Sequence, residues 1–251
     1  MIYEIPRFLA AGDRALLIEF GDAIDPELSR RVRRLQFAIQ EAKLPELVET
    51  VPTYRSLLVY YEPRQASPAE LKAKLEVLAG DTEGGRLPEP MVTEVPTVYG
   101  GEYGPDLEFV AQHNGLSHEE VIGLHAGRAY LIYMLGFIPG FAYLGGISPR
   151  IAAPRLATPR ARIPAGSVGI AGNQTGIYPA ESPGGWRLIG RTPIELFHPQ
   201  KEPPALLRMG NYVRFVPIPA EEFRRMKEEV EQGIYQVKET PLVREGESGR
   251  I

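Results

Sequence analysis

Arginine is concentrated in one stretch of the chain, residues 136–193, together with eleven glycines and eight prolines. The stretch carries six arginines, no lysine and one acid, Glu181, although the whole chain has a formal net charge of −4. A guanidinium binds carboxylate or phosphate through two parallel N–H bonds, and nearby glycines let backbone N–H groups approach an anion. The pattern predicts a site for a small anionic ligand or a surface for an acidic partner. A structural interpretation, in which these arginines pair with glutamates elsewhere or face solvent, is equally well supported by composition alone.

Aromatic and polar side chains lie among the turns of the same stretch. Aromatic residues in such segments more often fill the core than bind a ligand, which is the interpretation that composition favours for Tyr143 and Trp186. The polar tips of Gln174 and Tyr178 need hydrogen-bond partners if they are buried, so these two residues are stronger candidates for a functional role.

Several familiar sites are absent from the sequence. It has no GxxxxGK[ST], GxGxxG, HExxH, CxxC or GxSxG motif, and no cysteine. Four histidines have no spacing typical of a metal site, so structural roles are favoured, and His125 suits a helix C-terminal cap. We therefore predict no metal on this chain.

Charge and hydropathy also limit the partners and the location. A net charge of −4 does not favour nucleic acid. The uncharged run from Ala129 to Gly146 is short for a membrane span and is interrupted by glycine and proline. The N-terminus carries Glu4 and Arg7 and has no apolar stretch of signal-peptide length. We expect a soluble, cytoplasmic protein without a membrane segment.

The first part of the chain predicts a small α+β domain. Residues 15–20, 48–51 and 56–61 read as strands, and 26–44 as an amphipathic helix. A second helix begins at the capping box of Ser67 and Glu70 and stops at Gly80. The order strand, helix, strand, strand, helix favours a ferredoxin-like domain over residues 1–88, and the polar residues 81–90 read as a linker.

The second part predicts an all-β barrel. Residues 92–99 and 129–135 read as strands that flank two short helices opened by Asp106 and Ser117. Long helices are improbable in the Gly/Pro-rich stretch, so short strands follow, and residues 194–198 and 212–217 are expected to close the barrel. The barrel domain is placed at residues 89–220. A charged helix and a polar tail are placed at residues 221–251.

Several runs of sequence resemble one known family. They are GFIPGFAYLGG (136–146), TPRAR (158–162), residues 164–193, PTYRSLL (52–58) and VYGGEYG (98–104). They are similar to the KipI family, also described as allophanate hydrolase subunit 1 or carboxyltransferase subdomain C/D. The resemblance covers about residues 1 to 220. It implies a small α/β N-terminal domain followed by a cyclophilin-like β-barrel, a fold that does not by itself imply prolyl isomerase activity.

The resemblance also implies a function. Many members are the B subunit of an ATP-dependent 5-oxoprolinase, which opens 5-oxo-L-proline to L-glutamate with a KipA-like C subunit and a LamB/YcsF-like A subunit. ATP is then expected at the level of the complex, and the lone chain is expected to be inactive. A KipI-like inhibitor of a sensor histidine kinase and half of a biotin-dependent urea carboxylase carboxyltransferase domain are the alternatives. By motif, the residues expected to bind the anion and the ring are Arg55, Tyr143, Arg160, Gln174, Tyr178 and Trp186. No general base is assigned.

Overall fold

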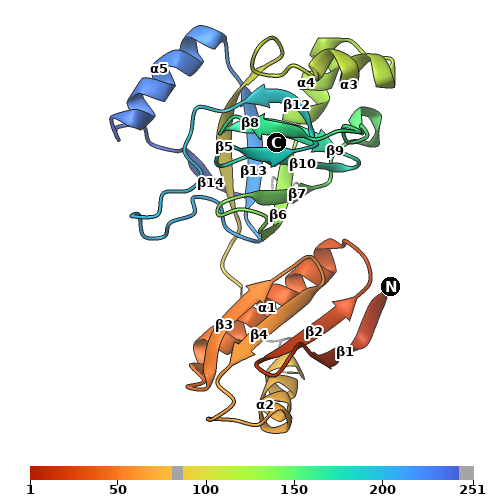
Figure 1. The fold of residues 1–251 in the computed structure, drawn as a ribbon, viewed down its shortest axis with the longest axis vertical. Coiled ribbons are helices and arrows are strands. Elements are labelled where there is room, and N and C mark those ends of the chain that lie inside the picture. Colours follow the sequence, from red (N-terminus) through yellow and green to blue (C-terminus); the bar gives the residue numbers. More distant parts are fainter. Residues whose placement is uncertain (81–86, 243–251) are drawn as a thin grey trace, which may run out of the picture. The chain divides into compact units, whose positions relative to one another are not determined.

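The computed structural model describes residues 1–80 and 87–242, and the chain divides into two compact units, Met1–Pro88 and Glu89–Ile251 (Figure 1). Residues 81–86 of the predicted linker and residues 243–251 of the predicted tail lie outside the described residues. Within the described ranges, no helix is both long enough and apolar enough to cross a membrane.

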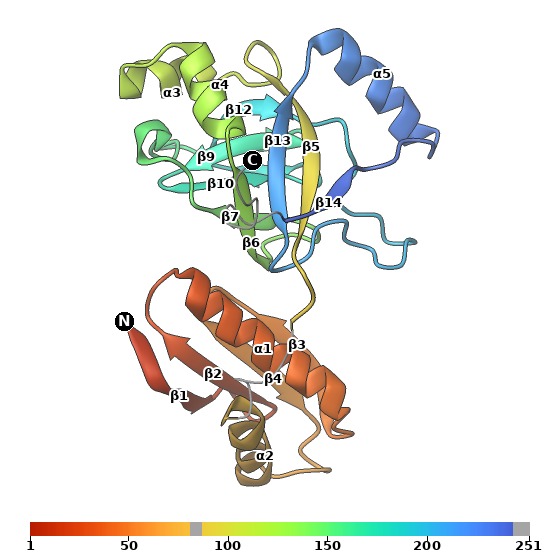
Figure 2. The ribbon, with the colours of Figure 1, turned by 180° about the vertical axis from the view of Figure 1, so that it is seen from behind.

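The first unit is a four-stranded antiparallel sheet covered by two helices that pack on each other (Figure 2). Across the sheet, the strands are β1 (Ile2–Ala10), β2 (Ala15–Gly21), β4 (Ser56–Tyr61) and β3 (Leu47–Pro52). The helices are α1 (Pro26–Ala42) and α2 (Pro68–Gly80). Alternate residues of β2 and β4 and one stripe of each helix are buried, because strand and helix periods both turn apolar side chains to one face.

Strand β1 is not predicted from the sequence. Most of its residues are exposed, and its pairing with β2 shifts register between Ile2 and Arg7, around Pro6. An edge strand with a bulge and a proline has a weak alternating pattern, which is why the sequence does not reveal it. The predicted series from β2 to α2 is present, with the Ser67–Glu70 capping box formed, and the predicted α+β fold class is confirmed.

The second unit contains a closed ring of seven strands. In ring order these are β12 (Arg187–Arg191), β9 (Ser167–Ala171), β10 (Gln174–Ile177), β7 (Ala142–Gly145), β6 (Ala129–Leu135), β13 (Tyr212–Pro217) and β5 (Met91–Tyr99). Pairing of β12 with the end of β5 closes the ring. The predicted barrel is therefore confirmed, although closure differs from the expectation.

The expected closing strand at 194–198 is not formed. This segment makes a single bridge, between Phe197 and Ala205. Pro193 and Pro199 flank it and have no backbone N–H for a ladder, while β12 already occupies the pairing edge of β5.

Further elements surround the ring. They are α3 (Leu107–Asn114), α4 (His118–Ala126), the 3₁₀ turn at Pro149–Ile151, the β8 (Arg160–Ile163) and β11 (Ser182–Gly184) ribbon, α5 (Ala220–Glu231) and β14 (Glu239–Pro241). α5 contacts β5, and β14 pairs with the beginning of β5.

His125 lies fully buried beside the main core, and both of its ring nitrogens are hydrogen-bonded. The Thr175 hydroxyl donates to the Gly169 carbonyl over 3.0 Å, so it accepts from His125 Nε2–H over 2.8 Å. The Tyr99 hydroxyl then donates to Nδ1 over 2.7 Å. His125 thus has the predicted structural role, but through side-chain partners and not as a helix cap. Burial lowers the pKa of His125 to about 3, which keeps the ring neutral.

This neutral histidine predicts acid sensitivity. Its folded-state pKa lies below the ordinary value of 6.5, so its stabilisation is complete above about pH 6.5 and declines toward the folded-state pKa of about 3. We expect the free energy of unfolding to fall by up to about 1.4 kcal/mol per pH unit through this group. Urea unfolding between pH 7 and 5 checks this. His125→Gln should be less stable at pH 7 and lose most of the slope from 6.5 to 5.5, whereas His113→Gln should keep it. An unchanged slope in His125→Gln would contradict the assignment.

Candidate functional site

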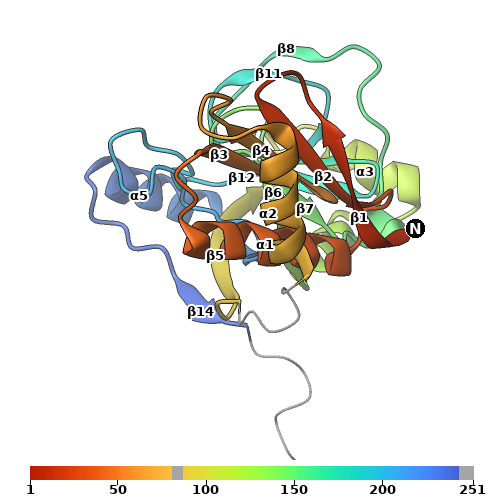
Figure 3. The same cartoon turned by 90° about the horizontal axis from the view of Figure 1, so that it is seen from below.

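The sheet formed by β7, β9, β10 and β12 has two buried faces. Val168 and Ile170 of β9 point into the main core of the barrel, whereas Ala171 points to a second, smaller core. The members of this outer core are Phe141, Ile163, Ala171, Tyr178, Trp186 and Leu188. Ile163 comes from β8, which lies beside β11 in Figure 3, so the β8–β11 ribbon helps to cover this outer face.

Trp186 packs close to the sheet because two strand positions beside it are glycine. A Cβ atom added to Gly176 would lie 3.0 Å from Cζ3 of the indole, and one added to Gly169 would lie 3.1 Å from Cβ of Trp186. Side chains larger than hydrogen would push the indole outward. These two glycines therefore fix the depth of the outer core.

An aromatic pocket of about 220 Å³ opens above this outer core. Its lining residues are Phe137, Phe141, Tyr143, Arg155, Leu156, Pro159, Tyr178, Gly184, Gly185 and Trp186. Phe141 is central, since its ring meets those of Tyr143, Tyr178 and Trp186 edge-to-face at centroid distances of 5.0, 5.3 and 5.5 Å. Phe137 at the rim is 60% exposed and has a left-handed backbone with φ of 68°. Strain of this kind is typical of functional loops.

Arg155 is the charged residue in this lining. Hydrogen bonds hold its segment in place: Leu156 N–H donates to the Gly185 carbonyl over 2.7 Å, and Arg187 Nε donates to the Pro154 carbonyl over 3.2 Å. The pocket therefore combines aromatic faces with a guanidinium, which suits a small ring that bears an anionic group.

Tyr178 supplies a neutral hydroxyl to the pocket. Burial raises its pKa, while a hydrogen bond from the backbone of Trp186 and the positive charges of Arg155 and Arg160 act in the opposite direction. The phenol remains protonated at neutral pH and can donate or accept a hydrogen bond.

Arg160 binds an acid of its own chain. Its Nη1 and Nη2 donate to the two carboxylate oxygens of Asp106 over 2.9 Å each, and Asp106 is 6% exposed. Asp106 also accepts the Leu188 N–H over 2.7 Å and lies 3.8 Å from Arg187. This arrangement places Arg160 in a structural network, and its role in anion binding remains a prediction.

The structure brings together three of the six predicted site residues, namely Tyr143, Tyr178 and Trp186, in one pocket. Gln174 of β10 is paired with Ala171 of β9 and lies on the same outward face of the sheet, but it is not among the residues that line the aromatic pocket. Arg55 lies in the other unit, where it donates to the Gly21 carbonyl over 2.9 Å and lies 3.7 Å from Glu19.

Arg155, Phe137 and Phe141 are pocket residues that the sequence-based selection omits. All three belong to the Gly/Pro-rich stretch, and Arg155 is one of its six arginines, so the compositional signal includes them without singling them out. Among residues 1–80 and 87–242, no group of three or more His, Cys, Asp or Glu side chains is placed to hold a metal ion.

Comparisons with known proteins agree on one family. Residues 6–207 match the family described as carboxyltransferase domain, subdomain C and D. The chain is 46% identical to the 5-oxoprolinase B subunit of Bacillus subtilis, over 87% of this chain and 95% of that protein. It is 41% identical to the 5-oxoprolinase B subunit of Escherichia coli O157:H7, over 82% and 93%. The urea carboxylase structure from Kluyveromyces lactis superposes with a TM-score of 0.77, over 96% of this chain and 25% of that one. Its identity is 21%, so this likeness concerns the fold alone.

The Asp106–Arg160 pair predicts a structural cost for the loss of Arg160. We expect Arg160→Ala to reduce the free energy of unfolding by about 1.5–3 kcal/mol, because a buried carboxylate loses two charge-assisted bonds. Arg162→Ala is the matched control on the same strand. That side chain is 78% exposed and pairs with Glu181, so its loss should change stability by less than about 1 kcal/mol. Equal stability of the two variants in urea would show that Arg160 is free for another role.

Proposed function

The chain belongs to the family of the carboxyltransferase domain, subdomain C and D, and from this premise we propose that it is the B subunit of a 5-oxoprolinase. The observation that carries the proposal is the 46% identity to the 5-oxoprolinase B subunit of Bacillus subtilis over nearly the whole length of both chains. The proposed reaction is the ATP-dependent opening of 5-oxo-L-proline to L-glutamate. The proposed partners are a KipA-like C subunit and a LamB/YcsF-like A subunit.

The aromatic pocket is the proposed binding site for the substrate. Its volume of about 220 Å³ suits a ligand smaller than a drug molecule. The flat lactam ring would lie against the faces of Trp186 and Tyr143, and its carboxylate would bind Arg155. The Tyr178 hydroxyl would donate to the lactam oxygen, because this phenol is neutral at physiological pH.

Opening the lactam requires activation of the amide. In the proposed sequence, ATP transfers its terminal phosphoryl group to the amide oxygen, and water attacks the ring carbon. The ring nitrogen then leaves as an amine, and a second water releases phosphate from the side-chain acyl phosphate. Fixed positive groups would stabilise the charge that develops. The pocket lining includes no carboxylate, histidine or lysine. The acid–base groups and the ATP site are therefore proposed to come from the partner proteins.

Reconstitution tests the assignment. We expect no glutamate release from 5-oxoproline and ATP by the lone chain, and turnover when the KipA-like and LamB/YcsF-like partners are added, measured by coupled detection of glutamate. Turnover by the lone chain would refute the proposal that the partner proteins supply the acid–base groups and the ATP site. Absence of turnover by the three purified proteins together would refute the assignment and favour the kinase-inhibitor or carboxyltransferase alternative.

Arg155 provides a sharper test within the active complex. Arg155→Gln should raise KM for 5-oxoproline by roughly ten- to a hundredfold, since one charge-assisted bond to the substrate carboxylate contributes about 1.5–3 kcal/mol. The melting temperature should not change, because Arg155 is exposed. Arg150→Gln, an exposed arginine of the same stretch, is the control and should keep the original KM. An unchanged KM in Arg155→Gln would remove Arg155 from substrate binding.

A further inference from the structure

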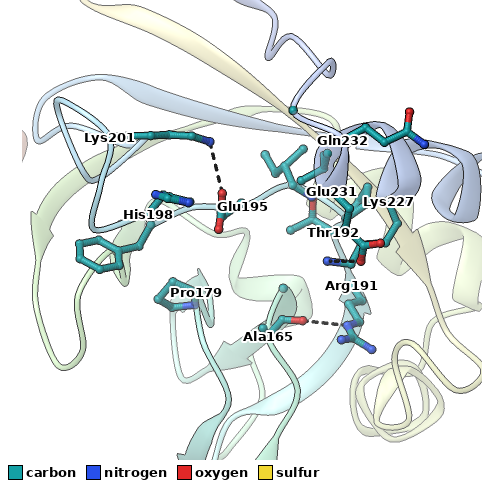
Figure 4. A pocket seen from close by; sticks show the side chains of 16 residues that line it. Ala165, Pro179, Arg191, Thr192, Glu195, His198, Lys201, Lys227, Glu231 and Gln232 are labelled. Atoms are coloured by element: carbon teal, nitrogen blue, oxygen red, sulfur yellow. Dashed lines mark hydrogen bonds and ion pairs between the residues drawn. The ribbon is translucent and has the colours of Figure 1, made fainter.

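A second cavity, of about 460 Å³, lies in the barrel unit and shares no lining residue with the aromatic pocket (Figure 4). One wall runs from Arg191, the last residue of β12, to Lys201, and the other runs from Lys227 in α5 to Gly233, just beyond the end of that helix. Pro179, Ile194, Phe197 and Val230 supply apolar surface between these walls. Nothing in the proposed reaction uses this cavity.

Charges of both signs line the cavity. Lys201 pairs with Glu195 over 3.2 Å and Lys227 pairs with Glu231 over 3.4 Å, and Figure 4 shows these two ion pairs on different sides of the cavity. Both pairs are substantially exposed, so each can exchange its partner for a ligand group at small cost.

Of the three lysine and arginine side chains that line the cavity, Arg191 is the one that forms no ion pair with a described acid, whereas Lys201 and Lys227 each form one. The Nε of Arg191 donates to the Ala165 carbonyl over 2.8 Å, which orients the guanidinium, and Figure 4 shows this bond at the wall of the cavity. Nη1 and Nη2 make no hydrogen bond or ion pair with any residue of the described ranges. An oriented guanidinium with free donors suits the bidentate binding of a carboxylate.

The end of α5 provides the opposite polarity. The last turn of α5 carries no basic residue, and Glu231, Gln232 and Gly233 line the cavity. The carbonyl end of a helix carries partial negative charge, which favours a bound cation. A positive ligand group is therefore stabilised within the same cavity that offers Arg191 to an anion.

We propose that this cavity binds an acidic α-amino acid in its zwitterionic form. The carboxylates would bind Arg191 and Lys201, and the ammonium would bind Glu231 and the end of α5. The lysine and arginine side chains of the lining number three and its acids two, an excess of one positive charge that complements the net charge of −1 on such a ligand. A simple anion would bring no positive group for the two acids of the cavity, and a simple cation would bring no negative group for Arg191.

Calorimetric titration of the lone chain tests the proposal. L-Glutamate is the probe, a choice that rests on the proposed function because glutamate is the product of that reaction. We expect L-glutamate to bind at least tenfold more tightly than glutarate, which lacks the ammonium, and than inorganic phosphate. Arg191→Gln should weaken L-glutamate binding at least tenfold, since it removes a charge-assisted bond. Arg224→Gln, an exposed arginine of α5 outside the cavity, should leave binding unchanged.

A second variant keeps the test decisive if Arg191→Gln does not fold. Glu231→Gln removes the ammonium partner and should weaken L-glutamate more than glutarate. Absence of L-glutamate binding, equal binding of phosphate, or full affinity in the cavity variants would each overturn the proposal. The titration needs neither partners nor turnover, so its failure leaves the proposed function untouched. Failure of the reconstitution would likewise leave the binding result standing.

Discussion

The carboxylate of Asp106 joins three parts of the barrel unit that are far apart in the sequence. It accepts two hydrogen bonds from Arg160 at the beginning of β8 and one from the Leu188 N–H of β12. Asp106 is also the N-cap residue of α3. A carboxylate that is 6% exposed is costly to bury unless its oxygens are hydrogen-bonded, and here both are. The pair anchors the β8–β11 ribbon to the ring of strands, and the end of that ribbon supplies Gly184 to the wall of the aromatic pocket.

Alternation along short strands lets one sheet serve two cores. In β9 and β10, the inward residues fill the barrel, whereas the outward residues support Trp186 and Phe141. The rings of the outer core meet edge-to-face, so each ring limits the movement of the next. A pocket built on such a base has a rigid floor, and Arg155 is placed above it by a hydrogen-bonded segment. Rigid surfaces of this kind lower the entropic cost of binding a small ring.

The barrel unit keeps its potentially reactive groups away from the aromatic pocket. The neutral His125 is enclosed by Tyr99, Thr175, Tyr130 and Phe215 and serves packing. The pocket offers ring faces, a phenol and a guanidinium, which bind and orient a ligand but do not transfer protons readily near neutral pH. This composition suits a protein that contributes recognition to a larger assembly. The second cavity likewise presents charged groups suited to binding, two ion pairs and the guanidinium of Arg191.

The sequence by itself determined the local elements and the family. The capping box at Ser67–Glu70 forms as predicted, and the helix predicted to begin at Ser117 has a capping box with Glu120, because a cap depends on residues three positions apart. The helical stripe of α1 and the Gly/Pro-rich strands were predictable for the same reason. Composition also located the arginine-rich stretch, and the family resemblance selected Arg160 from it, but neither showed that Arg160 pairs with Asp106 while Arg155 lines the aromatic pocket.

Only the tertiary structure decided that distinction. The partner of Arg160 lies 54 residues earlier in the chain, and no local pattern encodes a pairing across that separation. Tertiary contacts also decide which segments become strands. Residues 2–10 form β1 because they pair with β2, whereas residues 194–198 form no strand because β12 already pairs with β5. Periodicity and helix capping depend on residues that are close to one another in the sequence, so the sequence reveals them. The assignment of a charge to a salt bridge or to a pocket depends on contacts that exist only once the chain has folded.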